Sequence, residues 1–289
     1  MPRTLHSKLP GDFKTLPLLV EANGEGLKYQ RLGLPLNFGQ MLARRRPISI
    51  ADPHNFSAEL ANLGVSVRLT LHWQGRDYWI LVRQQRTDRQ DEVLKLISGY
   101  VPAQELGLPL FTAIQEIAEE CLIESGDGWL AGRFADAWLP TPYRGSLRYL
   151  ASHHFDLQSL ASTSRPVRCG ALRLTEEPHA YVHVPTASLQ LVYDLRLVLP
   201  RECRAPSFYH VDERLEEGCL VARLDLERPD LYLLDPLLGT LHNLQQGRLQ
   251  PVVGDGLWLS ESFAPQEGWL IQAERVAFEQ WRAQRAVAS

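Results

Sequence analysis

Three glutamates in a short segment with apolar periodicity are the residues of this chain best placed to do chemistry. Glu116 is three residues before Glu119 and four before Glu120, so a helix would place all three on one face. Like charges at this spacing repel one another unless a cation lies among their oxygens. Mg²⁺ and Mn²⁺ prefer carboxylate and water ligands. The segment therefore predicts a divalent-metal site on one face of one helix.

A purely structural role is the alternative, because surface helices often carry several glutamates as a solvated face. The residues just upstream favour chemistry. Residues 94–97 are typical of a strand, residues 98–101 of a turn around Gly99, and a helix is expected to begin near Thr112. A strand, a glycine loop and an acidic helix would then form one compact unit.

This unit resembles the Nudix box. The box consists of a glycine, five residues, a glutamate, seven residues and the series Arg-Glu-apolar-any-Glu-Glu-any-Gly-apolar. Gly99, Glu105, Glu116, Glu119 and Glu120 occur in the matching order. The resemblance is confined to the box and its flanks, a small part of the chain.

The resemblance implies a hydrolase that cleaves a diphosphate linkage in a nucleoside diphosphate derivative or a related small molecule. Within residues 94–123 it assigns the three helix glutamates to catalysis and to binding of Mg²⁺ or Mn²⁺, with Glu116 a candidate for positioning or activating the attacking water. Gly99 and Glu105 are assigned to the substrate site. Loop N–H groups near Gly99 would approach the phosphates, and Glu105 would be a supporting carboxylate.

The sequence departs from the family pattern in three places. Nine residues separate Glu105 from Gln115, so the loop carries a two-residue insertion. Gln115 stands where the family has arginine, which removes a fork-shaped donor. Leu122 stands where the family has glycine, so the helix is expected to run on toward Gly126.

Every position that would hold metal is retained, so we favour an active hydrolase. Two alternatives stay open. The first is a Nudix-like module that has lost catalysis and binds a ligand or a partner, for which Gln115 and Leu122 are the evidence. The second is an unrelated mixed α/β protein with an acidic surface helix.

The resemblance also implies a fold. We expect an α/β protein built as a Nudix-like α/β/α sandwich with a mixed sheet, plus extensions at both ends. Residues 1–60 would be an N-terminal extension and residues 61–245 the Nudix-like domain, with a loop-rich insertion near 131–187. Residues 246–289 would be a C-terminal extension with a helix.

Alternating apolar and polar residues predict individual elements. A hairpin is expected from strands at 65–73 and 78–84, and further strands at 188–199 and 219–226. Residues 265–285 are interpreted as an amphipathic helix that includes Trp269 and Trp281. That aromatic helix is where a homodimer interface would form.

Other residues have weaker claims to function. Arg44, Arg45 and Arg46 would suit phosphate, although a solvated basic loop is favoured. The family often takes one more carboxylate from a distant loop. The candidates are Glu176, Glu177, Asp212, Glu213, Glu216 and Glu217, with Glu216 ranked first.

Several histidines and aromatic residues have an ordinary structural explanation. The pairs His153–His154 and His179–His183 lack metal-ligand spacing, so ordinary packing is favoured. Trp138, Tyr143 and Tyr149 have side chains able to stack on a base, but core packing explains aromatics at least as often.

Composition limits the class of protein. The chain has 289 residues, 45% of them hydrophobic, which is ample for a core. A net charge of −4 provides no broad attraction for nucleic acid. No apolar run approaches the roughly 20 residues that span a bilayer, and Lys8, Asp12 and Lys14 interrupt any secretory signal. Four unpatterned cysteines favour free thiols in the cytoplasm.

Overall fold

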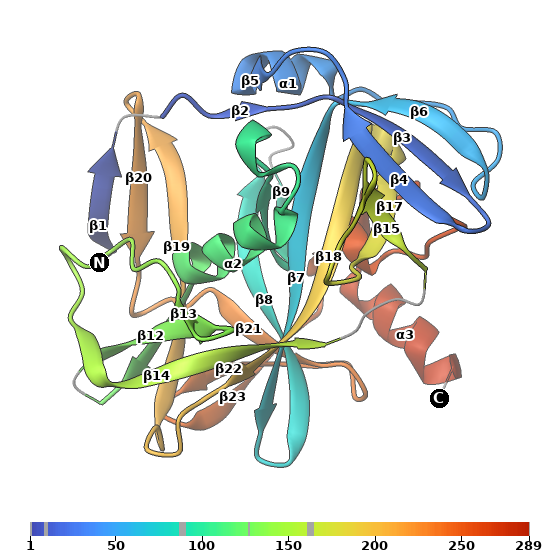
Figure 1. The fold of residues 1–289 in the computed structure, drawn as a ribbon. Helices are drawn as coiled ribbons and strands as arrows, with labels where there is room; N and C mark the ends of the chain where they lie inside the picture. The colour runs from blue at the N-terminus through green and yellow to red at the C-terminus, as the bar shows by residue number, and fades with distance from the viewer. Residues whose placement is uncertain (1, 9–10, 87–90, 127, 161–164, 289) are drawn as a thin grey trace.

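The computed structural model describes residues 2–8, 11–86, 91–126, 128–160 and 165–288 and shows a mainly β protein (Figure 1). Strands account for 54% of the residues and helices for 13%. The described residues contain three α-helices beside one network of 19 strands, a five-stranded sheet and a two-stranded pair. The expected α/β/α sandwich is therefore wrong.

Most of the helices and strands are short. The helices are α1 (Phe38–Arg44), α2 (Pro109–Glu120) and α3 (Phe278–Ala288), with single 3-10 turns η1 (Ala103–Glu105), η2 (Val184–Thr186) and η3 (Glu261–Phe263). The strands before α2 are β1 (Arg3–Lys8), β2 (Lys14–Thr15), β3 (Leu18–Asn23), β4 (Gly26–Arg31), β5 (Leu36–Asn37), β6 (Phe56–Leu60), β7 (Asn62–Trp73), β8 (Arg76–Arg86), β9 (Asp91–Lys95) and β10 (Ile97–Tyr100). The strands after α2 are β11 (Cys121–Ser125), β12 (Gly128–Phe134), β13 (Ala137–Trp138), β14 (Tyr149–Leu160), β15 (Val167–Cys169), β16 (Leu172–Arg173), β17 (His179–His183), β18 (Ser188–Val198), β19 (Pro206–Glu216), β20 (Cys219–Leu224), β21 (Leu231–Asp235), β22 (Thr240–Gln245), β23 (Arg248–Val252), β24 (Trp258–Ser260), β25 (Leu270–Ile271) and β26 (Arg275–Ala277).

The long strand β7 organises the sheet. One edge of it pairs in parallel with β18 along most of its length. The other edge pairs antiparallel first with β10 and then with β8. The predicted hairpin is confirmed, because Gln74 and Gly75 both take positive φ in the tight turn between β7 and β8. The predicted strand at 188–199 is confirmed as β18, and the one at 219–226 as β20.

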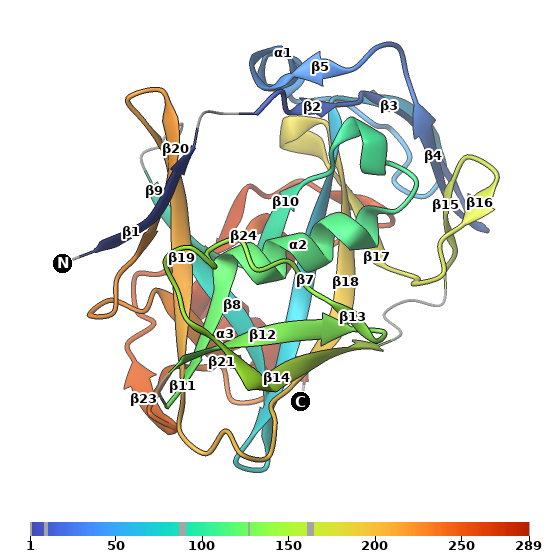
Figure 2. The same cartoon turned by 60° about the vertical axis from the view of Figure 1, so that its left-hand side comes forward.

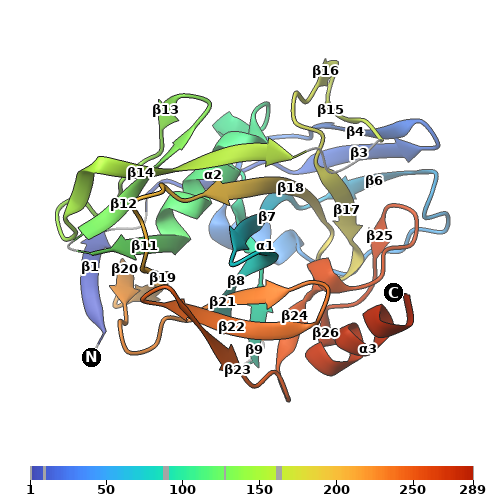
Figure 3. The same ribbon diagram turned by 90° about the horizontal axis from the view of Figure 1, so that it is seen from below.

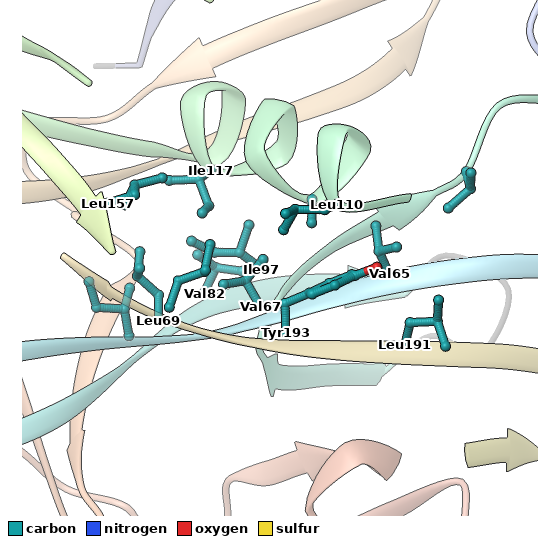
Figure 4. Packing of buried hydrophobic residues seen from close by; sticks show 14 of the residues in the cluster. Val65, Val67, Leu69, Val82, Ile97, Leu110, Ile117, Leu157, Leu191 and Tyr193 are labelled. Atoms are coloured by element: carbon teal, nitrogen blue, oxygen red, sulfur yellow. The ribbon is translucent and has the colours of Figure 1, made fainter. Parts of the chain in front are cut away.

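Helix α2 covers one face of these strands (Figure 2). Its apolar side buries Leu110, Ala113 and Ile117, which recur at helical spacing. Figure 4 shows Leu110 and Ile117 above Val67 of β7 and Ile97 of β10. The glutamates of α2 lie beside this stripe, toward the strands β8, β9 and β19.

The opposite face is covered mainly by strands, which is the physical reason the sandwich expectation fails. Leu81 of β8 and Val192 of β18 belong to a second core cluster, whereas Val82 and Leu191 belong to the cluster under α2. The second cluster takes most of its other side chains from β21–β26, and α3 adds Phe278 and Trp281. Figure 3 shows α2 and α3 on different sides of β7 and β18.

The two terminal regions and the expected insertion differ from the sequence interpretation in detail. Strand β1 pairs with β20, and β3, β4 and β6 form the small sheet together with β15 and β16 (Figure 1). About half of the described part of residues 131–187 is strand, and the rest consists of turns and loops such as residues 139–148; residues 161–164 lie outside the described ranges. Prolines and glycines interrupt the alternation of apolar and polar residues in this stretch, so the sequence pattern did not predict its strands.

The predicted C-terminal helix is shorter than expected. It begins at Phe278, and Trp269 precedes the short strand β25. Trp269 and Trp281 are buried within the chain at 3% and 5% exposure. Both aromatic side chains are therefore used in the protein's own core.

Helix α2 also differs from its predicted bounds. It begins at Pro109, a residue suited to the first helical position, and it ends at Glu120 instead of continuing toward Gly126. Leu122 lies in β11, where it pairs with Tyr209 of β19 and is buried. Pairing with β19 therefore ends the helix, and no glycine is needed.

Candidate functional site

The helix glutamates line a cavity of about 180 Å³, which we call the acidic cavity. All three predicted metal ligands lie in its wall, so the structure brings Glu116, Glu119 and Glu120 together as expected. They are joined by residues of strands β8, β9 and β19 and of the loop before β14. The remaining lining residues are Arg83, Gln84, Lys95, Tyr143, His210, Val211, Asp212 and Glu213.

The register of β19 explains how two more carboxylates reach the site. Strand β11 starts directly after α2, and its first residue, Cys121, pairs with His210. Strand β19 continues past this point, so Asp212 and Glu213 lie beside the last turn of α2. Five carboxylates therefore surround one cavity, and two of them come from a segment almost a hundred residues further along the chain.

Gly99 contacts Glu116 directly. A Cβ atom at Gly99 would lie 1.9 Å from Glu116 Oε1 and 2.2 Å from its carboxyl carbon. Gly99 is part of strand β10, opposite Val65 of β7, and not of a turn as predicted. Its role is to leave room for the carboxylate, not to present loop N–H groups.

Lys95 is the cation nearest the centre of the cluster. Its ammonium group lies 3.2 Å from Glu120 Oε1, and it donates hydrogen bonds to the carbonyl and hydroxyl oxygens of Ser98, each at 3.2 Å. Lys95 is only 8% exposed, so its charge is only weakly screened by water. One buried ammonium thus offsets a small part of the negative charge.

The crowding changes the protonation of the glutamates. Burial, and then the neighbouring Glu120, raises the pKa of Glu116 to about 8, against an opposing effect of Lys95. Burial also raises the pKa of Glu119, which Lys8 opposes, and the pKa of Glu120, which Lys95 opposes. Glu116 therefore holds a proton at neutral pH when no metal cation is bound.

The histidine in the wall does not share that proton. Burial, with help from Lys95 and Arg214, lowers the pKa of His210 to about 3. Its imidazole is therefore neutral across the physiological range. Glu213 pairs with His6 at 3.1 Å and with Lys8 at 3.3 Å, which ties strand β1 to the rim of the cavity.

Tyr143, which also lines the acidic cavity, contacts the end of α2. Its hydroxyl donates to the carbonyl oxygen of Glu119 at 2.9 Å, and its ring stacks on His6 with centroids 5.3 Å apart. The residue is buried at 3% exposure. Packing and capping of the helix end therefore account for this aromatic side chain.

The residues present fit a hard divalent cation. All five acidic donors are oxygens, and Glu120 Oε2 is buried without a hydrogen-bond partner. A cation would satisfy that oxygen and remove the repulsion that raises the carboxylate pKa values. Across the described ranges, no group of three or more His, Cys, Asp or Glu side chains is already arranged to hold a metal, so binding would have to draw the carboxylates together.

Some predicted site residues lie elsewhere. Glu105, in η1, accepts a hydrogen bond from Thr112 Oγ1 and lines neither this cavity nor its neighbour. Glu216, ranked first as the distant carboxylate, pairs with Arg223 on the β19–β20 hairpin. Asp212 and Glu213, named in the same group of candidates, are the residues at the cavity.

A second cavity, of about 260 Å³, adjoins the first, and we call it the polar cavity. Gln84 and Lys95 line both. The polar cavity lies over β7, β10 and β18 and includes Gly99 in its wall. Apart from Val93 and Leu96 its described wall is mostly polar, with Arg45, Ser66, Gln85, Ser98, Tyr100, His183, Thr186, Gln190 and Glu261 among its residues.

Arg45 corrects the interpretation of the basic run. Arg44 and Arg46 are exposed, as a solvated loop requires, but Arg45 is half-buried and lines the polar cavity. Its guanidinium donates to the hydroxyl of Tyr100 at 2.5 Å and lies over that ring, 5.5 Å from its centroid. Its buried Nε has no hydrogen-bond partner.

Sequence reasoning missed the two residues that connect the cavities. Lys95 and Gln84 stand in ordinary strand patterns, and no local motif distinguishes them. The only available signal was the position of Lys95 in an otherwise apolar run, Val93-Leu94-Lys95-Leu96-Ile97, where a charged residue requires a partner.

None of the helices in the described parts of the chain combines the length and apolar character needed to cross a lipid bilayer. The chain matches no known family profile, and no curated protein matches it either.

Proposed function

We propose that this protein is a divalent-metal-dependent hydrolase that cleaves a diphosphate linkage in a nucleoside diphosphate derivative or a related small molecule. The proposal retains the resemblance of residues 94–123 to the Nudix box as its starting point. It does not require an α/β/α sandwich, because the strand, the glycine and the acidic helix adjoin one another in this fold as well.

One observation carries the proposal. Glu116, Glu119 and Glu120 line a cavity together with Asp212 and Glu213, instead of facing open solvent. A solvated acidic helix, the structural alternative, has no need of two further carboxylates from another strand. The concentration of hard oxygen donors around an orphaned Glu120 oxygen is the arrangement that a divalent cation stabilises.

The chain's own residues then take defined roles. Glu116, Glu119 and Glu120 would hold the cation, with Asp212 and Glu213 as additional oxygen donors. A bound Mg²⁺ or Mn²⁺ supplies charge for the phosphate oxygens and lowers the pKa of a water molecule. Glu116, fixed against Gly99, would position that water.

Lys95 would act on the substrate side. Its ammonium lies in the wall that both cavities share. Once Glu120 is engaged with metal, Lys95 would donate to a phosphate oxygen, a charge-assisted hydrogen bond. The scissile diphosphate would therefore lie where the two cavities meet, beside Lys95.

Turnover of a substrate panel tests the function. We would measure phosphate or phosphomonoester release from nucleoside diphosphate sugars, dinucleoside polyphosphates, dinucleotide cofactors and nucleoside triphosphates, with Mg²⁺ or Mn²⁺. Native protein should turn over at least one class, and Glu120→Gln should abolish that turnover with its circular dichroism spectrum unchanged. Glu25→Gln, an exposed glutamate in the β3–β4 turn, is the matched control and should behave as native.

A folded Glu120→Gln variant with native activity would contradict the assignment, as would a silent native protein across the whole panel. Silence would favour the second candidate, a ligand-binding module without catalysis. The ion pair between Lys95 and Glu120 supports that alternative, because the ammonium group already pairs with a carboxylate that is expected to bind the metal. Metal binding measured by calorimetry at pH 8 distinguishes a working metal site from this Lys-filled one.

A further inference from the structure

The polar cavity has a composition of its own. The wall contributes amide side chains from Gln84, Gln85 and Gln190 and hydroxyl groups from several serines. These groups donate and accept hydrogen bonds without carrying charge. Such a lining matches a ligand rich in hydroxyl groups, since each hydroxyl is both a donor and an acceptor.

Gln190 is held in place for such a contact. Its Nε2 donates to Ser188 Oγ at 3.1 Å, and Ser188 Oγ lies 2.9 Å from Thr186 Oγ1. Thr186 Oγ1 lies 2.7 Å from His183 Nδ1, which extends the chain of hydrogen bonds. A side chain oriented by such a network contributes specificity, because little rotamer freedom is lost on binding.

Gly64 makes the room for Gln190. A Cβ atom at Gly64 would lie 2.4 Å from Gln190 Oε1. Gly64 pairs with Tyr100 of β10 and with Gln190 of β18, so it lies on the floor of the cavity. The absence of a side chain at this position is what lets a polar group occupy the sheet surface.

Arg45 supplies positive charge to the same wall. Its Nε is buried and lacks an acceptor, and a buried donor without a partner costs free energy. Lys95 adds a second cation at the border with the acidic cavity. A phosphate group would satisfy the orphaned Arg45 donor, because guanidinium binds phosphate with matched geometry.

A nucleobase fits this cavity poorly. Base recognition commonly uses an exposed aromatic face. Besides the buried imidazole of His183, the aromatic ring in the described wall is that of Tyr100. The Arg45 guanidinium lies over that ring.

We infer that the polar cavity binds a compact phosphorylated polyol, the chemistry of a sugar phosphate, with Arg45 on the phosphate and Gln190 on the hydroxyl groups. The inference rests on the proposed function only in placing this group as one half of the cleaved diphosphate. Binding itself requires no metal, since the cavity's own cations are Arg45 and Lys95.

Calorimetry in EDTA tests the inference, with glucose 1-phosphate and ribose 5-phosphate as probes and glucose, inorganic phosphate and adenosine as comparisons. We expect a sugar phosphate to bind more tightly than glucose or phosphate alone, and adenosine not to bind. Arg45→Met should weaken sugar phosphate binding at least about tenfold. Arg44→Met, the exposed neighbour on α1, is the matched control and should bind as native.

Gln190→Ala provides a second variant, which should weaken the sugar phosphates and leave the affinity for inorganic phosphate unchanged. Circular dichroism would verify that each variant is folded. Absence of sugar phosphate binding by the native protein, tighter binding of adenosine, or native affinity in both Arg45→Met and Gln190→Ala would overturn the inference.

Glu120→Gln separates this inference from the proposed function. It should retain sugar phosphate binding in EDTA, because Lys95 then loses its competing carboxylate. Binding without turnover in the native protein would support the cavity and contradict the hydrolase. Turnover without sugar phosphate binding would support the hydrolase and contradict the sugar phosphate site.

Discussion

The acidic cavity and the polar cavity share Lys95 and Gln84 but are built on different principles. The acidic cavity concentrates carboxylates from α2 and β19 that repel one another. The polar cavity holds mostly neutral hydrogen-bonding groups over β7, β10 and β18, and its wall also contains the charged residues Arg45, Lys95 and Glu261. In each, a glycine of the central strands leaves room for a polar side chain, Gly99 for Glu116 and Gly64 for Gln190.

The two cavities differ in the electrostatic free energy of their lining groups. The acidic cavity carries an unfavourable electrostatic term that a cation would relieve, so its ligand is expected to be positive. The polar cavity lacks such crowding, and its orphaned donor on Arg45 calls for an anion. Two adjoining sites of opposite preference suit a metal-bound phosphate ester better than either would suit a single neutral ligand.

Removing the shared cation should have the largest effect on stability. Lys95→Met leaves Glu120 buried without its ion-pair partner, which is expected to lower the free energy of unfolding by about 3 kcal/mol or more at pH 8.5. The loss should be smaller at pH 6, because Glu120 can then neutralise itself by taking up a proton. Urea denaturation in EDTA measures the free energy of unfolding at both pH values.

The double variant Lys95→Met/Glu120→Gln is its control and should recover most of that stability. Equal losses in the single and double variants would show that Lys95 stabilises the fold by packing alone.

The two glycines should respond unequally. Gly99→Ala would place a Cβ atom 1.9 Å from Glu116 Oε1, so the carboxylate must move by more than an ångström. Displacement on that scale is expected to reduce hydrolysis about a hundredfold. Steady-state kinetics with the best substrate from the panel would measure the loss.

Gly64→Ala is the matched comparison, because its Cβ meets the end of the flexible Gln190 side chain. We expect kcat to change little and KM for the substrate to rise. Equal effects of the two substitutions on kcat would remove the distinction between the cavities.

Protonation of Glu116 should make the metal-free protein less stable as pH rises. The folded state keeps this proton up to about pH 8, whereas the unfolded chain releases it near its usual 4.5. Folding therefore loses free energy between these two values and levels off above pH 8. Denaturation midpoints from pH 5 to 8.5 in EDTA should fall in native protein and flatten in Glu116→Gln.

Affinity for Mn²⁺ should change in the opposite direction, because binding requires the ionised carboxylate. It is expected to increase up to about pH 8. A pH-independent Mn²⁺ affinity would show that Glu116 is not among the metal ligands.

Glu105 should show the smallest effect. Its carboxylate accepts from Thr112 Oγ1 at the start of α2 and lines neither cavity. Glu105→Gln is therefore expected to change turnover by less than about twofold and to lower the free energy of unfolding by about 1 kcal/mol. A large loss of turnover with unchanged stability would restore Glu105 to the substrate site, as the family pattern assigns it.

Several features were predictable from local sequence. The hairpin of β7 and β8 follows from alternation around Gln74 and Gly75, and the shared face of the helix glutamates follows from their spacing. The fold class was not predictable in this way. An acidic helix after a strand suggested a helix-covered sheet, but the second face is covered largely by β21–β26, whose pairing depends on distant partners.

Helical geometry acts over three or four residues, so the local sequence already places Glu116, Glu119 and Glu120 together. Tertiary contacts, in contrast, end α2 at Glu120 where β11 begins, bring Asp212 and Glu213 to the cluster, and place Lys95 and Arg45 in the walls of the cavities. These placements depend on the register of strands far apart in the chain. Such register is set by the packing of the whole core, and no single segment encodes it.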